Sequence, residues 1–169
     1  RITFKEADVV YGYQQMMENI HGEVYSKLLS EIITDIDERT ILTNSFRTIE
    51  PVKIIIEWGQ NWTASKRRIG YKLLAYVIFE GLMFSGVFAA IYWLKFKNVS
   101  GASGMKGLIL SNEWISRDEG LHTITGVAVY NLVKHKVPES DVHIMMREAA
   151  NISKNFFRGS IVTDLIGMK

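Results

Sequence analysis

Apolar residues recur at helical spacing along most of this chain, and no segment of useful length alternates at strand spacing. The pattern predicts an all-α protein built from long helices. Thr3 and Glu6 fit a capping box, and Pro51 suits the first turn of a helix. The expected helices share polar starts and apolar faces; they cover about residues 3–33, 35–46, 51–62, 67–97 and 108–135, and a last one runs from a Ser140 cap to a break near Gly159. The glycine- and serine-rich segment from Asn98 to Gly107 is expected to be a loop.

Composition narrows the class of protein. A chain of 169 residues with 47% hydrophobic residues and two prolines is expected to form one helical domain with a sizeable core. Its formal net charge is +2, and no basic stripe with interleaved aromatic residues indicates a nucleic-acid binder. The absence of cysteine excludes disulfides and metal sites built on sulfur.

Two Glu-x-x-His motifs, Glu18 to His21 and Glu119 to His122, are the main chemical signal. In each motif the carboxylate and the imidazole lie on the same face of a helix, about one turn apart. Glu80 adds a carboxylate within an otherwise apolar helix. Helical bundles that bind two metal ions supply a Glu from each of two helices and a Glu-x-x-His from each of two others. Because the set contains carboxylates and imidazoles without sulfur, it favours iron or manganese.

The apolar run from Leu73 to Phe96 has a second interpretation. Glu80 is its only charged residue before Lys95, so the run is long and apolar enough for a transmembrane helix. An ionised carboxylate well inside a membrane span is costly unless it is paired or binds a metal. A central helix of a bundle is also apolar on all sides, and we favour that interpretation.

Other residues extend these motifs along their helices. Tyr25 follows Glu18 and His21 on one stripe, as a core tyrosine or as a phenol that a redox-active metal pair can oxidise. Phe84 and Phe88 share a stripe with Glu80, which suits ordinary core packing and a dry pocket beside the metal equally. Asp118 is either a solvated helix charge or the carboxylate to which a metal-bound histidine donates its second N–H. His135 and His143 lack a carboxylate at ligand spacing and are given surface roles.

Three stretches carry a family resemblance: Met17 to Ser26, Phe79 to Lys95, and Leu110 to His122. They resemble the small, radical-generating subunit of class I ribonucleotide reductase, and the ending from Leu165 to Lys169 is also similar to a stretch of that family. The resemblance implies a ferritin-like helical bundle with a di-metal carboxylate site between its helices. It implies two iron ions, or an iron/manganese or di-manganese pair, with these ligands: Glu18, His21, Glu80, Glu119 and His122.

The resemblance also implies roles around the metal. Tyr25 matches the tyrosine that carries the radical, and Phe84, Phe88 and Ile115 match its apolar pocket. Asp118 matches the electron-transfer aspartate joined to His21. The family reduces dioxygen, oxidises the tyrosine and passes the oxidising equivalent to a large subunit, where ribonucleotides become deoxyribonucleotides. We therefore expect a large-subunit partner, a homodimer or heterodimer of small subunits, a cytoplasmic location, and binding to neither nucleic acid nor membrane.

The chain departs from the family pattern at several points. The family's aspartate ligand and its electron-transfer tryptophan would lie before Arg1, the tail that docks on the large subunit would lie after Lys169, and Gly22 replaces a usual serine. Residues 1–169 are therefore expected to be one ferritin-like domain truncated at both ends. Two alternatives stay open. One is a non-catalytic scaffold paralogue of the subunit, and the other is a different di-metal carboxylate oxidase or metal-storage protein.

Overall fold

The computed structural model describes residues 4–64, 66–97 and 105–160, which contain helices and no strand. The predicted all-α class is confirmed. The helices, in chain order, are α1 (Lys5–Ile32), α2 (Ile36–Thr43), α3 (Ser45–Thr48), α4 (Glu50–Thr63), α5 (Ile69–Ile78), the π-helical segment η1 (Phe79–Met83), α6 (Ser85–Lys97), α7 (Lys106–Asn131) and α8 (Glu139–Ser160).

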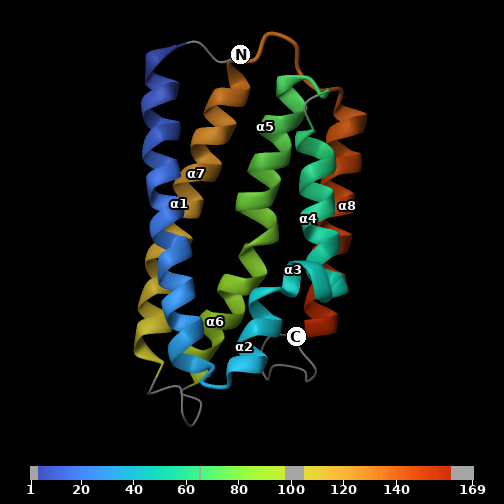
Figure 1. The fold of residues 1–169 in the computed structure, drawn as a ribbon. Coiled ribbons are helices and arrows are strands. Elements are labelled where there is room, and N and C mark those ends of the chain that lie inside the picture. The colour runs from blue at the N-terminus through green and yellow to red at the C-terminus, as the bar shows by residue number, and fades with distance from the viewer. Residues whose placement is uncertain (1–3, 65, 98–104, 161–169) are drawn as a thin grey trace.

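The long helices form a bundle around the run α5–η1–α6 (Figure 1). Helices α1 and α7 lie together on one side, and α4 and α8 on the other, while α2 and α3 cross one end. Contacts join α5 and η1 to α7 on one side, and α5 to α4 and both α5 and η1 to α8 on the other. The run that contains Glu80 is therefore the central element of the described bundle.

The main apolar core lies between α4, α5, η1 and α8, away from α1. Its buried members are Trp58, Ala75, Ile78, Met83, Met145 and Ala149. Trp58 Nε1 and Trp62 Nε1 both donate to Oε2 of Glu148, at 3.0 Å each, which links α4 to α8. This core does not include the helix pair α1–α7, which carries the buried polar side chains of the described chain: Gln14, His21, Asn112, Glu119 and His122.

One helical run of the described chain, Ile69–Lys95, is long and apolar enough to cross a membrane by length and composition alone. Only 17% of its most apolar window is buried inside the bundle. Its contacts with α4, α7 and α8 are those of a central bundle helix. The choice of a bundle helix over a membrane span stays a prediction.

The predicted single helix over 67–97 is interrupted by a π-helical turn at Phe79–Met83. Hydrogen bonds of the i→i+5 type add a residue to the turn, and such turns are often found at functional sites. Gly81 lies within it, facing α7, where an added Cβ would come 2.9 Å from Cγ2 of Thr123. The absence of a side chain at position 81 therefore allows η1 and α7 to approach closely.

Several predicted boundaries move by a few residues. The helix expected over 35–46 divides at Asn44 into α2 and α3, and Asp35 caps its start by accepting from Glu38 N at 2.8 Å. Helix α7 begins at Lys106 and ends at Asn131 rather than near residue 135. Its end is closed by Lys136, which donates to the carbonyl of Tyr130.

Of the two predicted helix caps, the Ser140 cap is wrong, and the Thr3 cap lies outside the described residues. Helix α8 begins at Glu139, so Ser140 is inside its first turn, and the carbonyl of Pro138 accepts from Asp141 N and Val142 N. Helix α1 begins at Lys5 after Phe4, which makes no side-chain cap. Thr3, most of the predicted loop at 98–104 and the Leu165 to Lys169 ending lie outside the described residues.

Candidate metal centre

The five predicted ligands come from three neighbouring elements. Helix α1 carries Glu18 and His21, η1 carries Glu80, and α7 carries Glu119 and His122. The i, i+3 spacing places each histidine one turn after its glutamate, on the face that is turned towards the other two elements. The approach of η1 to α7 at Gly81 brings the Glu80 carboxylate into the same space.

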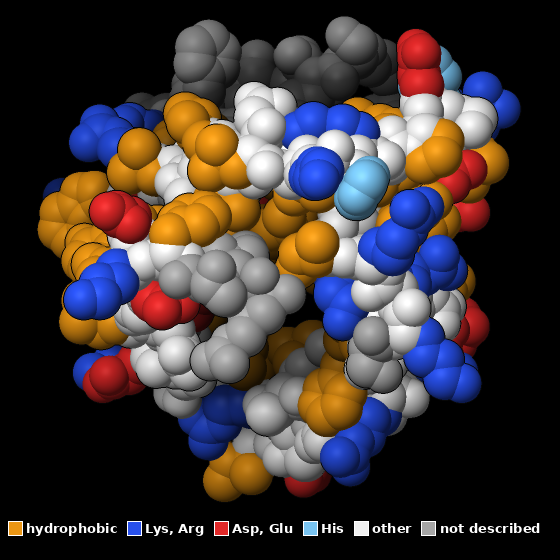
Figure 2. Space-filling view, turned by 90° about the horizontal axis from the view of Figure 1, so that it is seen from above, with side chains coloured by type: hydrophobic (Ala, Val, Ile, Leu, Met, Phe, Trp, Pro, Cys, Tyr) orange, Lys and Arg blue, Asp and Glu red, His pale blue; other side chains and the backbone are white. Residues whose placement is uncertain are grey.

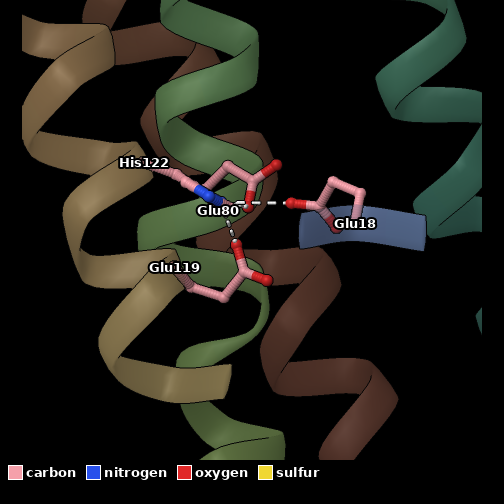
Figure 3. Close-up of side chains that lie close together, drawn as sticks. All are labelled: Glu18, Glu80, Glu119 and His122. Carbon is pink, nitrogen blue, oxygen red and sulfur yellow. Dashed lines mark hydrogen bonds and ion pairs between the residues drawn. The ribbon is translucent and has the colours of Figure 1, made fainter. Parts of the chain in front are cut away.

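Four of these side chains converge closely. One ligand atom from each of Glu18, Glu80, Glu119 and His122 lies within 4.8 Å of the others (Figure 3). Nδ1 of His122 lies 2.9 Å from Oε2 of Glu119, 3.1 Å from Oε1 of Glu18 and 3.8 Å from Oε2 of Glu80. Three carboxylates from three elements therefore surround one imidazole nitrogen.

His21 reaches the same cluster from the other side. Its Nδ1 lies 3.2 Å from Oε1 of Glu119 and 3.7 Å from Oε2 of Glu18. Its Nε2 lies 3.0 Å from Oδ2 of Asp118, the carboxylate predicted to accept the second N–H of a ligand histidine. The rings of His21 and His122 have centroids 6.3 Å apart. The two imidazoles thus flank Glu119, each with Nδ1 towards the carboxylates.

The cluster is largely shielded from water, and this alters its electrostatics. The side chains of Glu119, His21 and His122 are 5%, 6% and 9% exposed, whereas that of Glu18 is 42% exposed. Burial, then a hydrogen bond with Glu119 and the negative charges of Glu119 and Glu18, raises the pKa of Glu80 to about 10. Burial, followed by the charge of Glu119, also raises the pKa of Glu18. Carboxylates gathered without a cation disfavour one another's ionisation.

The donor set fits metal ions. Oε1 of Glu18, Nδ1 of His21 and Oε2 of Glu80 are buried and make no regular hydrogen bond within the described residues. Buried polar atoms without partners are unusual and call for an explanation. Here all three face the cluster, where a cation would bind them and offset the raised carboxylate pKa values. Oxygen and imidazole donors without sulfur suit iron or manganese.

The predicted radical pocket adjoins the cluster. A cavity of about 380 Å³ is lined by Glu18, His21, Gly22, Tyr25, Phe84, Val87, Phe88, Ile115 and Glu119. All three predicted pocket residues thus lie around Tyr25. Burial, then the charges of Glu119 and Glu18, raises the pKa of Tyr25, so the phenol keeps its proton beside the carboxylates. Tyr25 is nevertheless 38% exposed, so the cavity is less closed than the predicted dry pocket.

A family model described as "Ribonucleotide reductase, small chain" matches residues 1–169. The chain belongs to this family. It is 38% identical over 167 residues to a ribonucleoside-diphosphate reductase small chain of Acanthamoeba polyphaga mimivirus, covering 99% of this chain and 39% of the relative. It is 39% identical over 167 residues to the small chain of Swinepox virus, covering 99% and 59%. A ribonucleoside-diphosphate reductase small chain of Arabidopsis thaliana is 40% identical over 167 residues, covering 99% and 48%.

The chain spans about half the length of these ribonucleotide reductase small chains. The predicted family is therefore confirmed over the whole chain, together with the all-helical, ferritin-like fold. The roles of individual residues stay predictions, although the structure brings the predicted ligands, Asp118 and the pocket residues together.

Sequence reasoning missed a polar cluster one turn before the predicted ligands Glu18 and Glu80. Gln14 is buried on α1, four residues before Glu18, and its Nε2 donates to the hydroxyl of Tyr76, four residues before Glu80. The hydroxyl of Tyr11 is also buried nearby, without a hydrogen-bond partner in the described chain. Extending each ligand stripe by one turn towards the N-terminus would have found Gln14 and Tyr76.

The two remaining histidines are exposed, in keeping with the surface roles given to them. His143 lies 3.8 Å from Glu139. His135 lines a separate cavity of about 460 Å³, with Arg68, Leu73, Val129 and Lys134, where α5 begins and α7 ends. Figure 2 looks onto this end of the bundle and shows both hydrophobic and basic side chains gathered on it.

Proposed function

We propose that this chain carries the metal-binding core of a ribonucleoside-diphosphate reductase small chain. In this proposal the five predicted ligands bind two metal ions, namely iron or an iron/manganese or di-manganese pair. The observation that carries it is the convergence of three carboxylates and the His122 imidazole from three separate elements on one buried point. The buried atoms of Glu18, His21 and Glu80 that make no regular hydrogen bond support it, because a cation would bind all of them.

Each side chain has a distinct task in this proposal. In the tautomer with hydrogen on Nε2, His21 donates to Asp118, which leaves Nδ1 free to bind metal. The metal pair, when bound and reduced, would supply two of the four electrons that convert dioxygen to water, an added reductant would supply one more, and Tyr25 the last. Tyr25 would give up one electron and its phenolic proton, and become the stored oxidant. Phe84, Phe88 and Ile115 would keep water from the oxidised ring.

The proposal extends to the complete enzyme through the relatives. Their names assign them to the small chain of ribonucleoside-diphosphate reductase. We accordingly propose a large-subunit partner that uses the oxidising equivalent to convert ribonucleotides to deoxyribonucleotides. A dimer of small subunits in the cytoplasm, with no binding to nucleic acid or membrane, completes the proposal.

Metal content and radical spectroscopy test the proposal together. The protein is loaded anaerobically with Fe²⁺ or Mn²⁺ and reductant, exposed to dioxygen and measured for metal per chain and for an electron paramagnetic resonance signal. We expect Tyr25→Phe to abolish the radical signal while metal content stays unchanged. Tyr13→Phe is the matched control, since Tyr13 is also on α1 and is 61% exposed. A radical signal that persists in Tyr25→Phe would contradict the role of Tyr25. A second variant, Glu119→Gln, should bind less metal, and an unchanged metal content would contradict the proposed metal site.

A further inference from the structure

One hydrogen bond joins the two helices that carry Glu18 and Glu80. Nε2 of Gln14 on α1 donates to the hydroxyl oxygen of Tyr76 on α5. Gln14 is only 8% exposed, and its other amide atom, Oε1, has no partner among the described residues. If the amide is rotated by 180°, the phenol can donate to that oxygen instead, so the pair is bonded in either orientation.

The pair occupies equivalent positions on the two helices. Gln14 precedes Glu18 by four residues, and Tyr76 precedes Glu80 by four residues. Helical side chains lean towards the N-terminus of their helix. The Glu18 carboxylate therefore lies over the turn that carries Gln14, and the Glu80 carboxylate lies over the turn that carries Tyr76. The phenol and the Glu80 carboxylate lie near enough that, after burial, the charge of Glu80 raises the pKa of Tyr76.

The Gln14–Tyr76 hydrogen bond is one of the few polar side-chain contacts that attach α1 to the rest of the described bundle. Helix α1 packs chiefly on α7. In the described part of the chain, two side-chain hydrogen bonds join α1 to its neighbours: Gln14 to Tyr76 on α5, and His21 to Asp118 on α7. Two ion pairs between predicted ligands also join α1 to α7, namely His21 with Glu119 and Glu18 with His122. The second hydrogen bond uses the predicted ligand His21. The first uses no ligand, and it fastens α1 to the run that carries Glu80.

The ring of Tyr76 fits closely against α7 as well. At Gly126 on α7, an added Cβ would come 3.0 Å from Cε1 of Tyr76. A glycine at that position therefore makes room for the ring between α5 and α7. The phenol is held on one side by α7 and on the other by Gln14, through contacts that involve none of the predicted ligands.

We propose that Gln14 and Tyr76 are positioning residues that set the separation of Glu18 and Glu80 and so tune the affinity of the site for divalent metal. This inference rests on the proposed function. Loss of the Tyr76 hydroxyl leaves the buried amide of Gln14 without a hydrogen-bond partner, which costs free energy. Movement of α1 that brings this amide to another partner or to water lowers that cost. Partners that orient ligands change metal affinity by about 10- to 100-fold when removed.

Two variants of the pair and one matched control test the inference. Tyr76→Phe removes the hydroxyl, and Gln14→Met removes the amide at similar volume. Tyr71→Phe is the control, because Tyr71 is on the same helix but its hydroxyl donates to Asp141 of α8. The probe is Co²⁺, whose affinity and visible absorption bands report the number and geometry of ligands. Amide hydrogen exchange on the metal-free protein reports the attachment of α1 independently of metal.

We expect Tyr76→Phe to weaken Co²⁺ binding about tenfold, to change the absorption bands and to speed hydrogen exchange in α1 around Glu18. The double variant should lose no more affinity than either single variant, because both remove the same hydrogen bond. Tyr71→Phe should leave Co²⁺ affinity within twofold (about 0.4 kcal/mol) of the unchanged protein.

Three results would overturn the inference. Unchanged Co²⁺ affinity and bands in Tyr76→Phe would show that the pair does not tune the site. Equal effects of Tyr76→Phe and Tyr71→Phe would show a general effect on stability. Unchanged hydrogen exchange in α1 would show that the bond does not position that helix. If the protein without substitutions bound no Co²⁺, the proposed function would fail together with the inference about metal affinity. The hydrogen-exchange data would still show whether the pair attaches α1.

Discussion

Nε2 of His21 lies 3.0 Å from Oδ2 of Asp118, and this contact joins residues 97 apart in the chain. Both belong to stretches that the sequence singles out, yet they come from different helices. The contact orients the imidazole so that Nδ1 faces Glu119 and Glu18. It also fixes how far α1 can rotate relative to α7.

Asp118→Asn is expected to weaken metal binding by about 10- to 100-fold, because the amide is a poorer acceptor for the imidazole N–H. Isothermal titration with Mn²⁺ measures the change. Glu113→Gln is the control, since Glu113 pairs with exposed Arg117 on the same helix. Its affinity should stay within twofold of the unchanged protein (about 0.4 kcal/mol). An Asp118→Asn variant that behaves like this control would contradict the orienting role.

The metal-free protein should lose stability as pH rises. The pKa of Glu80 is raised from 4.5 to about 10 in the folded chain, so above pH 4.5 the unfolded chain releases a proton that the folded chain retains. This stabilisation is complete below pH 4.5 and is lost as pH rises towards 10, by at most about 1.4 kcal/mol per pH unit. Urea unfolding after chelation, at pH 6 and pH 8, measures the slope.

Glu80→Gln should flatten this pH dependence, because the amide does not titrate. The slope does not vanish entirely, since the pKa of Glu18 is raised as well. Glu57→Gln, at a side chain that is 55% exposed, should leave the slope unchanged. A Glu80→Gln slope equal to that of the unchanged protein would show that Glu80 does not carry the effect.

Gly81→Ala should destabilise the protein by about 1–3 kcal/mol, because the new Cβ would press on Cγ2 of Thr123 and push η1 away from α7. Gly12→Ala is the control, since nothing lies within 4 Å of its Cβ position. That change should be neutral or stabilise by up to about 1 kcal/mol, because alanine favours the helix. Chemical denaturation compares the two variants, and equal stabilities would contradict the close approach.

Glu148→Leu should destabilise the protein by about 1–3 kcal/mol, because it removes the acceptor of two indole N–H groups and leaves that of buried Trp58 unsatisfied. Combining it with Trp58→Phe should cost less than the sum of the single changes, since both remove the same hydrogen bond. Thermal unfolding measures each variant. Strict additivity would show that the carboxylate and the indole act independently.

The sequence predicts well that these carboxylates and imidazoles come together, because Glu-x-x-His places two donors on one helix face whatever surrounds it, and their role as ligands stays a prediction. It does not predict the π turn at Phe79–Met83, which depends on how closely Gly81 meets Thr123 of another helix. It also misses Gln14 and Tyr76, since a neutral amide and a phenol carry no metal-ligand signature. Their pairing appears only when two helices are placed side by side.

The exposure of Tyr25 is a further case that local pattern cannot settle. Its stripe with Glu18 and His21 correctly predicts the face on which it lies. How much of the ring meets solvent depends on which elements cover that face, and a stripe on one helix does not contain that information. The same holds for Glu18, whose side chain is 42% exposed.

The π turn also sets how α6 is rotated about its own axis relative to α5. An α-helix rotates by about 100° per residue. Deleting one residue from Phe79–Met83 to restore regular α geometry would therefore turn α6 by about that angle relative to α5. Phe84, Phe88 and Val87 would then leave the cavity beside Tyr25, while the apolar face of α5 would still fit its neighbours. The extra residue of the π turn thus lets the α6 side chains that line the Tyr25 cavity face the same side of the bundle as the Glu80 carboxylate.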